Sequence, residues 1–444
     1  MTLGTGFAAG VGGLTADVSG GNANMTERTL IRNAKIITCS APGTDSGSDV
    51  IADGDLLIEG DRIARVAAGR IEVDSGAARV VDLHGAAVLP GLGDAHVHMS
   101  WPLDFVFDHV SVANAPAAPH ALDVAAVART FLESGYTLVV GAGVSQPFDD
   151  VRTRDAIERG LIPGPRVIPS GTMITERGAI SADTGMTSVV SDARDIREVV
   201  ARQCDTGVRA LKLFVSGDGI VPEYPSDDLY MNDEMLSAAV DEADRYGAFI
   251  TVHARGSDSV AMAARNGVRV IHHACFLDDK AVHELEARRD DVWVCPGLHY
   301  LYAMVSGHAE PWGVTPEKIE RSGYEKEFHA QVEGIRQLRE AGIRILAGGD
   351  FGHQWTKHGT YAAELQRYVE LVGMSPQEAI NTATRNMGPL VGLDVGQVRA
   401  GYLADLLIVD GDPLADITVL QDPDRRRTVL KGGRFAYVNP RMFP

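Results

Sequence analysis

Eight short apolar runs rich in β-branched residues recur along the middle of the chain. They lie at residues 87–98, 136–143, 165–171, 210–217, 249–256, 269–275, 291–299 and 344–352. Continuous apolar runs of this kind, bounded by Gly, Pro or Asp, are typical of buried strands. Parallel strands are covered on both faces, so they show such runs rather than an alternating pattern. The pattern therefore predicts a parallel sheet.

Most of these runs are followed by a stretch in which apolar residues recur at helical spacing. Examples are residues 123–135, 231–247 and 325–342. Alternating strands and helices form βα units, and eight such units favour a closed (β/α)8 TIM-like barrel over an open doubly wound sheet. We expect this α/β barrel to span residues 89–390.

The two ends of the chain have a different pattern, with short alternating strands separated by turns. Hairpin-like segments lie at residues 55–69 and 427–438, the second with turn residues Gly432 and Gly433. We expect one small β-sandwich domain to be built from both chain ends. Its predicted parts are residues 27–88 and 391–444.

The first 26 residues are rich in Gly, Ala, Thr and Asn. They lack the basic start and continuous apolar core of a signal peptide, so we expect a disordered extension. The four cysteines lie far apart without a CxxC motif, which favours reduced thiols in a cytoplasmic protein.

Composition narrows the range of partners. Hydrophobic residues make up 45% of the 444 residues, and no apolar run approaches the roughly 20 residues of a membrane-spanning helix. The formal net charge of −19 argues against nucleic acid or an anionic membrane, because either would require a basic face. We expect a homo-oligomer that acts on a small-molecule substrate.

His96 and His98 end the first apolar run and form an HxH pair. Residues two apart on an extended segment point to the same face, so the two imidazoles can share one metal ion. The active sites of barrel enzymes lie at the C-terminal ends of the strands, where this pair is expected. An HxH pair alone is a weak signal, but the surrounding PGLGDAHVHM segment makes it more specific.

Lys212 lies inside the apolar run ALKLFV. The chain has only seven lysines, and Lys212 is the one that falls between Lys35 and Lys280. Burial lowers the pKa of a lysine, and a neutral amine can capture carbon dioxide as a carbamate whose two oxygens can bridge two cations. The alternative is a lysine that reaches solvent or pairs with a carboxylate.

Two further strands end in histidine. His253 is near the end of the fifth run, and His272 and His273 are adjacent near the end of the sixth. Because side chains alternate along a strand, we expect only one of the adjacent pair to face the barrel interior. We favour His273, which would hold a second metal ion together with His253.

Asp350 follows the eighth run, RILAGG. An Asp after Gly-Gly is often only a turn residue. Together with the other candidates it would lie beside a metal and a bound water, as a ligand and as the group that transfers the proton to the leaving group.

These residues, in this order, resemble the amidohydrolase superfamily. The stretches LKLFVSGDG, ITVHARGSDSVAMAARNGVRVIHHACFLDD and GYLADLLIVDGDPLADITVLQDPDRRRTVLKGGR are similar to its imidazolonepropionase-related branch, which includes Xaa-Pro dipeptidase-like and ochratoxinase-like hydrolases. The resemblance implies a binuclear centre. Zinc is expected, with cobalt or manganese as alternatives, and the implied site consists of His96, His98, carboxylated Lys212, His253, His273 and Asp350.

The resemblance also implies that Tyr230 contacts the scissile carbonyl. The chain departs from the branch at two places: His272 stands where Glu is usual, and Gly349 stands where Thr is usual. The predicted metal ligands are unaffected by either change. The substrate pocket, in contrast, is not expected to be preserved, so a peptide substrate typical of the branch does not follow from the resemblance.

The sequence favours a metal-dependent amidohydrolase that cleaves a C–N bond in an amide, dipeptide, carbamate or urea. Metal ions of this kind lower the pKa of bound water from 15.7 to about 7, which makes hydroxide available at neutral pH. Aromatic residues near the predicted strand ends favour a partly apolar substrate. They are Trp101, Phe105, Phe107, Tyr300, Tyr302 and Trp312.

Two alternatives remain open at this point. A mononuclear deaminase of the same superfamily would lack the bridging lysine and would carry an HxxE arrangement, whereas His253 is followed by Ala-Arg-Gly. A non-catalytic scaffold on the same barrel would not need all six candidate ligands.

Overall fold

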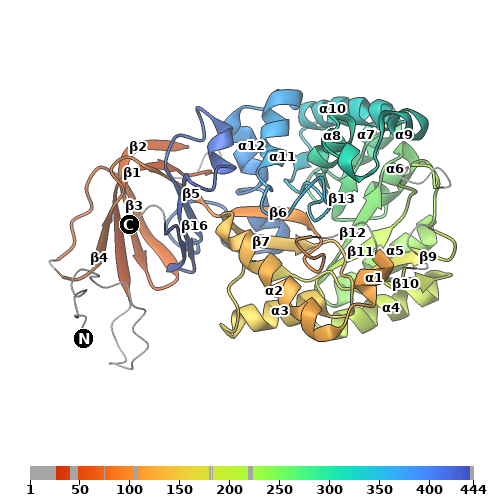
Figure 1. The fold of residues 1–444 in the computed structure, drawn as a ribbon, viewed down its shortest axis with the longest axis horizontal. Coiled ribbons are helices and arrows are strands. Elements are labelled where there is room, and N and C mark those ends of the chain that lie inside the picture. Colours follow the sequence, from red (N-terminus) through yellow and green to blue (C-terminus); the bar gives the residue numbers. More distant parts are fainter. Residues whose placement is uncertain are drawn as a thin grey trace, which may run out of the picture.

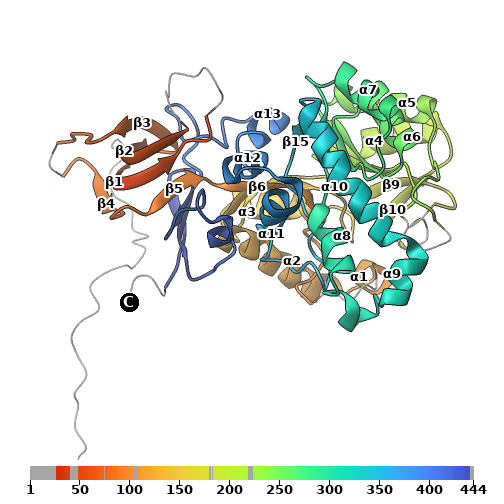
Figure 2. The ribbon, with the colours of Figure 1, turned by 90° about the horizontal axis from the view of Figure 1, so that it is seen from above.

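The computed structural model describes residues 27–40, 49–74, 76–104, 109–179, 182, 184–218 and 224–440. The expected N-terminal extension, residues 1–26, lies outside the described residues. Figures 1 and 2 show a body of strands surrounded by helices, with a sheet made from the two ends of the chain beside it.

Each of the eight apolar runs contains a strand of the body. The strands are β6 (Leu92–Val97), β7 (Tyr136–Gly141), β8 (Arg166–Ile168), β11 (Ala210–Phe214), β12 (Phe249–Ala254), β13 (Val270–His273), β14 (Trp293–Cys295) and β15 (Arg344–Ile345). Neighbouring strands pair in parallel, β6 to β8 in one sheet and β11 to β15 in another.

Hydrogen bonds between the two sheets close them into a barrel. On one side the backbone N–H groups of Arg209 and Ala210 donate to the Pro169 carbonyl just after β8, at 2.9 and 3.0 Å. On the other side Ala95 N–H in β6 donates to the Ala347 carbonyl after β15, at 2.9 Å. The predicted (β/α)8 barrel is therefore present, and all strand ends of one sense meet at one rim.

A pair of strands extends the barrel after β8 and was not predicted from the sequence. β9 (Met173–Glu176) pairs in parallel with β11 and with β10 (Thr187–Val190). Because β9 follows β8 after a short break, the two strands together occupy one position between β7 and β11.

Helices cover the outside of the barrel (Figure 1). The longer ones are α2 (Ala117–Glu133), α3 (Asp149–Glu158), α4 (Ala193–Asp205), α5 (Asp233–Arg245), α6 (Ser257–Arg265), α7 (Asp279–Ala287), α8 (Leu298–Val305) and α10 (Tyr324–Glu340). The shorter ones are α1 (His109–Ala113), α9 (Pro316–Ser322), α11 (Ala363–Arg367), α12 (Pro376–Thr382), α13 (Met387–Val391), the 3-10 turns η1 (Glu310–Trp312) and η3 (Ile417–Leu420), and the π-helical turn η2 (Tyr368–Val372).

Local sequence explains where these helices begin. In α5 the Asn232 side chain accepts from Met235 N–H, and Asp233 and Glu234 occupy the positive end of the helix dipole. The buried face includes Met235, Leu236 and Ala239, at helical spacing. Within the described residues, no helix is both long enough and apolar enough to cross a membrane.

The first apolar run, residues 87–98, is two strands rather than one. Its first part is β5 (Ala87–Pro90), which pairs with a strand from the C-terminal end of the chain, and its second part is β6. The chain changes sheet at Gly91, where any Cβ would collide with the side chain of Thr137. A glycine is needed here because the Thr137 side chain packs directly against this point of the backbone.

Strands from both chain ends share one eight-stranded sheet. The N-terminal strands are β1 (Arg28–Ile37), β2 (Val50–Glu59), β3 (Arg62–Ala68), β4 (Arg79–Asp82) and β5, and the C-terminal ones are β16 (Leu406–Val409), β17 (Arg426–Lys431) and β18 (Arg434–Val438). β16 pairs antiparallel with β5, and β17 and β18 form the hairpin expected from Gly432 and Gly433. This pairing places both ends of the chain beside the start of the first barrel strand.

Candidate metal centre

His96 and His98 lie at the end of β6 with their side chains buried in the barrel. The Asp94 carboxylate accepts a 2.8 Å hydrogen bond from the His96 backbone N–H and so holds the strand end. Asp350 Oδ1 lies 3.2 Å from His98 Nε2 and 3.5 Å from His96 Nε2. One candidate ligand atom from each of the three residues falls within 4.8 Å of the others. The structure thus brings together the HxH pair and the aspartate predicted beside it.

Asp350 adopts a left-handed backbone conformation, with φ of 53°. Two residues before it, a Cβ at Gly348 would collide with Cys295 Sγ and crowd the His96 backbone, so this position requires glycine. Burial raises the pKa of the Asp350 carboxyl, but its hydrogen bond with His98 and the nearby charges outweigh this and hold the pKa below the usual range. The carboxylate is therefore ionised at neutral pH.

Lys212 lies on β11 and is 1% exposed. Its Nζ is 3.3 Å from His96 Nε2 and 2.6 Å from His272 Nδ1. Among the described residues it forms no ion pair with a carboxylate, and its burial excludes the alternative in which it reaches solvent. Burial lowers the pKa of Lys212 to about 8. The neutral amine is therefore a minor form near neutral pH, but a much larger fraction than for an exposed lysine.

His253 and His273 form the second histidine pair predicted from the sequence. His253 lies on β12 and His273 ends β13, and their ring centroids are 4.4 Å apart. The His273 ring is also 5.1 Å from that of His96, so this pair adjoins the HxH pair. Burial holds the pKa of both imidazoles well below the ordinary value, which leaves them neutral, as metal ligands must be.

The expectation that only one of His272 and His273 faces the barrel interior is wrong. β13 ends at His273, where φ is 73°, and Ala274 also has a positive φ of 48°. The backbone turns at this point, so side-chain alternation does not continue and both imidazoles reach the cluster. The His272 ring stacks on that of His96, with centroids 4.0 Å apart and 14° between the planes.

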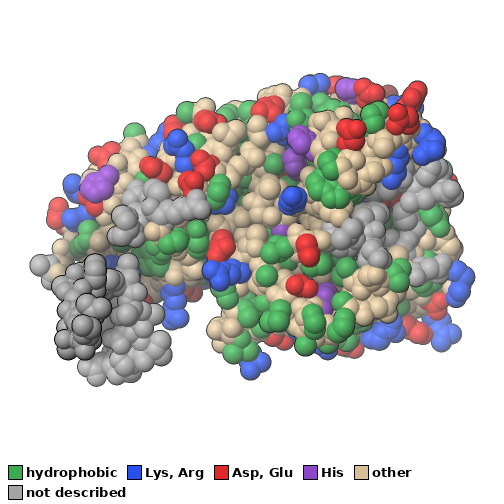
Figure 3. Space-filling model, viewed as in Figure 1, with side chains coloured by type: hydrophobic (Ala, Val, Ile, Leu, Met, Phe, Trp, Pro, Cys, Tyr) green, Lys and Arg blue, Asp and Glu red, His purple; other side chains and the backbone are tan. Residues whose placement is uncertain are grey.

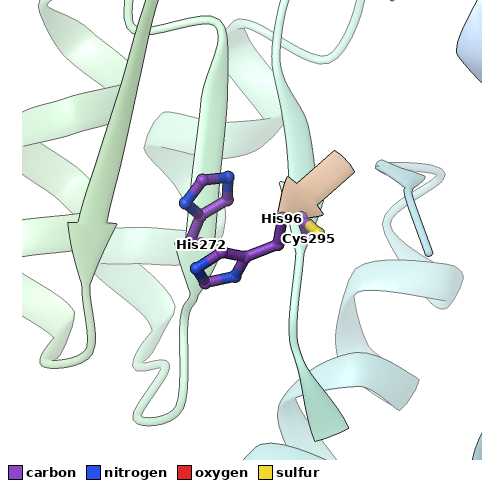
Figure 4. A group of neighbouring side chains, drawn as sticks. All are labelled: His96, His272 and Cys295. Carbon is purple, nitrogen blue, oxygen red and sulfur yellow. The ribbon is translucent and has the colours of Figure 1, made fainter. Parts of the chain in front are cut away.

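Figure 4 shows His96 and His272 with their rings facing one another and Cys295 beside His96. One candidate ligand atom from each lies within 4.8 Å of the others. Sequence reasoning missed His272 and Cys295, although each falls at the end of a predicted strand. Burial raises the pKa of the Cys295 thiol well above its ordinary value, so the thiol is neutral near neutral pH.

Tyr230 follows β11 after a loop whose residues 219–223 lie outside the described residues. Its backbone N–H donates to the Val215 carbonyl at 3.1 Å, and Leu229 pairs with Ser216. The Tyr230 side chain is buried. These contacts hold it beside the end of the strand that carries Lys212.

Arg255, two residues beyond His253, is buried between two carboxylates. Its guanidinium lies 2.7 Å from Asp218 Oδ1 and 2.6 Å from Glu327 Oε1. These ion pairs join the end of β12 to the loop after β11 and to α10. Sequence reasoning did not identify this arrangement, because the three residues are far apart in the chain.

Aromatic side chains form one wall of the centre. Trp101 stacks on the His98 ring with centroids 3.8 Å apart, and His353 meets the Trp101 ring edge-on at 4.7 Å. Tyr300 and Trp355 in turn lie 4.9 and 5.2 Å from the His353 ring. An apolar surface therefore lies directly beside the HxH pair.

The other predicted aromatic residues differ in their placement. Arg367 covers the ring of Tyr302, with its guanidinium carbon 4.2 Å from the ring centroid, and Trp312 is 40% exposed. Phe105 and Phe107 lie outside the described residues. Trp101 and Tyr300 are therefore the two predicted aromatic residues that the structure brings into the wall.

Comparison with known proteins agrees with this architecture. A family model for the amidohydrolase family matches residues 87–436, which include the whole barrel. The chain belongs to the amidohydrolase family. The match runs from β5, through every candidate ligand, to β18, so the candidate metal centre falls within it.

Several characterised relatives cover most of this amidohydrolase. Ochratoxinase of Aspergillus niger is 27% identical over 378 residues, which cover 78% of the chain and 75% of the relative. Imidazolonepropionase of Salinispora arenicola is 27% identical over 394 residues, covering 86% and 92%. A crystal structure of a Xaa-Pro dipeptidase with methionine in its active site superposes with a TM-score of 0.79 at 26% identity, covering 93% and 100%. The predicted resemblance is confirmed.

Proposed function

We propose that this amidohydrolase cleaves a C–N bond of an amide, dipeptide, carbamate or urea in a small molecule, using two divalent metal ions. Membership of the family makes it a hydrolase, and the names of its relatives support C–N bonds as the target. One observation carries the proposal: a buried lysine contacts imidazoles from two different strands, β6 and β13, with a carboxylate at the same rim.

The residues present fit such ions. Neutral imidazoles and a carboxylate are the donors that zinc, cobalt and manganese accept, with zinc the best match to a histidine-rich set. His96 and His98 would hold one ion, and His253 and His273 the other. Asp350 would add an oxygen ligand beside the HxH pair. The His96 and His98 Nε2 atoms both face the Asp350 carboxylate, as shared coordination requires.

Lys212 would bridge the ions as a carbamate. Its amine is buried without a carboxylate partner among the described residues, and burial lowers its pKa to about 8, which favours the neutral form that reacts with carbon dioxide. The resulting anion would supply two oxygens between the two histidine pairs. It would also balance part of the positive charge of the ions.

When bound, the ions would supply a nucleophile from water at neutral pH and would polarise the substrate carbonyl. Asp350 is ionised, so it can accept the proton of the attacking water and return it to the leaving nitrogen. We propose that the Tyr230 hydroxyl donates a hydrogen bond to the scissile carbonyl oxygen. These roles divide proton transfer and carbonyl stabilisation between two side chains.

The wall of Trp101, Tyr300 and Trp355 supports a partly apolar substrate. Its rings adjoin the His98 side of the centre, so a flat or apolar group attached to the scissile bond would contact them. Aromatic side chains present large apolar areas that stabilise such contacts.

Further proposals concern the whole chain. We propose that residues 27–88 and 391–444 form a small β-sandwich domain and that residues 89–390 form the catalytic barrel. Four buried free cysteines support a reducing, cytoplasmic environment. We also propose a homo-oligomer that acts on small molecules rather than on nucleic acid or membranes, as the net charge of −19 supports.

The test is metal analysis combined with a substrate panel. The purified protein should carry up to two ions per chain, lose activity with chelator and regain it on addition of zinc, cobalt or manganese. The panel should include N-acyl amino acids, Xaa-Pro dipeptides, aryl amides, carbamates and ureas. A protein without stoichiometric metal would be a scaffold, and release of ammonia from an aminated ring by a one-metal enzyme would identify a deaminase. Either result would contradict the proposal.

A further inference from the structure

His272 has no role in the proposed metal set, yet its contact with Lys212 is the shorter of that lysine's two contacts with imidazoles. His272 Nδ1 lies 2.6 Å from Lys212 Nζ, against 3.3 Å for His96 Nε2. The His272 ring is fully buried. Its other nitrogen, Nε2, has no hydrogen-bond partner among the described residues.

Both partners are fixed by the sheet. His272 pairs on one side with His253 in β12 and on the other with Cys295 in β14. Lys212 pairs with Thr251 in β12, so the two residues are held by a common neighbouring strand. The position of Nδ1 relative to Nζ is therefore a property of the barrel rather than of a mobile loop.

Formation of a carbamate determines which of the two residues, Lys212 or His272, donates the hydrogen bond. A neutral amine has two N–H groups and a lone pair, so it could donate to or accept from His272. When the amine attacks carbon dioxide, its lone pair forms the new N–C bond, one C=O electron pair moves to oxygen, and one N–H proton leaves to water. The nitrogen keeps a single N–H, and the electron pair left behind by the departing proton becomes a lone pair that is delocalised into the carboxylate. It can then only donate.

We propose that His272 is a positioning residue that accepts, at Nδ1, the single N–H of carboxylated Lys212 and thereby orients the carbamate. This inference rests on the proposed bridging role of Lys212 and deepens it. His96 Nε2, the other nearby nitrogen, would be occupied as a metal ligand, which leaves His272 as the acceptor. The proton of the His272 ring then resides on Nε2.

Orientation matters because the carbamate is planar for the same reason that a peptide bond is planar. When the direction of its N–H is fixed, the plane of its two oxygens is fixed as well. The direction in which the two oxygens face would then be set by the contact with His272. Without an acceptor at this position, the carbamate could rotate about the bond between Nζ and Cε, and its oxygens would bridge the ions for less of the time.

Two substitutions separate hydrogen bonding from packing. His272→Asn keeps an acceptor, because its Oδ1 is attached at the same distance along the side chain as Nδ1. His272→Phe keeps a flat ring that can stack on His96 but removes the acceptor. Carbamate per chain is measured by 13C NMR after equilibration with 13C-labelled bicarbonate, and zinc per chain is measured over a range of bicarbonate concentrations.

We expect wild type and His272→Asn to show the carbamate signal and to load with zinc. His272→Phe should lose most of the signal and bind zinc about 10- to 100-fold more weakly, with partial recovery at high bicarbonate, as for the loss of other groups that orient metal ligands. Equal carbamate in His272→Phe and wild type would overturn the inference. The inference would also be overturned if His272→Asn lost as much carbamate and zinc as His272→Phe. That result would indicate that the imidazole itself is a metal ligand.

The wild-type holoenzyme provides a measurement that needs no variant. A high-resolution crystal structure should show Nζ within hydrogen-bond distance of His272 Nδ1 and carrying the carbamate carbon. A carbamate whose N–H points to another acceptor would overturn the inference even if His272→Phe failed to fold. Absence of any carbamate in wild type would instead remove the proposed role of Lys212, so the two failures are distinguishable.

Discussion

The Lys212 side chain lies among imidazoles rather than among carboxylates, and this environment constrains the chemistry. A charged ammonium would be buried beside His96 and His272 without a counter-charge in contact with it. Burial of an unpaired charge is costly, so the neutral amine or an anionic derivative is favoured. The sequence predicted the burial of this lysine because it interrupts an apolar run in a chain that has only seven lysines.

Replacement of Lys212 tests the bridge. Lys212→Ala should lose both bound metal and activity, because it removes the carbamate oxygens. Short carboxylic acids such as acetate or propionate should restore part of both, since a carboxylate can occupy the space left by the side chain. Metal content and turnover are measured with increasing acid. A fully active Lys212→Ala enzyme without added acid would refute the bridging role.

Asp350 is predicted to act on the rate rather than on the binding of substrate. Asp350→Asn keeps an oxygen ligand near His98 but cannot accept a proton, so kcat should fall about 10²- to 10⁴-fold. The KM should change little, and most of the metal should be retained. Steady-state kinetics and metal analysis of the same preparation provide the test. A kcat within about twofold of wild type would exclude proton transfer by Asp350.

At the level of elements, most of the barrel follows from hydrophobic pattern. All eight predicted strands occur, because strands buried on both faces give apolar runs. The break at Gly91 could not be predicted, since it depends on the approach of Thr137 from another strand. His272 was missed because alternation along a strand allows only one of two adjacent side chains to face inward, whereas the positive φ of His273 lets both reach the cluster.

Arg255 is predicted to stabilise the junction of β12 with α10. Arg255→Gln would leave Asp218 and Glu327 buried without their common partner, which should cost about 3–5 kcal/mol. Urea unfolding measures this loss. Arg265→Gln is the matched control, because Arg265 pairs with Asp233 at 2.6 Å on the surface, where such pairs contribute about 0–1 kcal/mol. Equal effects of the two substitutions would contradict the prediction.

At the level of the whole molecule, the chain has a strong negative charge but no single charged face in view. Figure 3 shows acidic and basic side chains interspersed over the described part of the face it presents. The histidines of the centre, in contrast, are buried at one rim of the barrel. The charges that affect the proposed chemistry are therefore those of the buried side chains at this rim rather than those of the surface.

Metal should stabilise the whole fold, because its ligands come from β6, β11, β12, β13 and the segment after β15. Ligand binding to the folded state adds about 2.7 kcal/mol per site when the free metal is at 100 times its Kd. Chelator should therefore lower the Tm of the wild-type protein. The Tm of Lys212→Ala should respond much less, and an equal response in both proteins would place the stabilising metal elsewhere.

Anomalous X-ray scattering from crystals of the metal-loaded protein tests the central claim most directly. Data collected on either side of the zinc absorption edge should show two peaks flanking Lys212 Nζ, one beside His96 and His98 and the other beside His253 and His273. Continuous density should join Lys212 to both peaks. Peaks absent from this cluster, or a single peak with an unmodified lysine, would contradict the account.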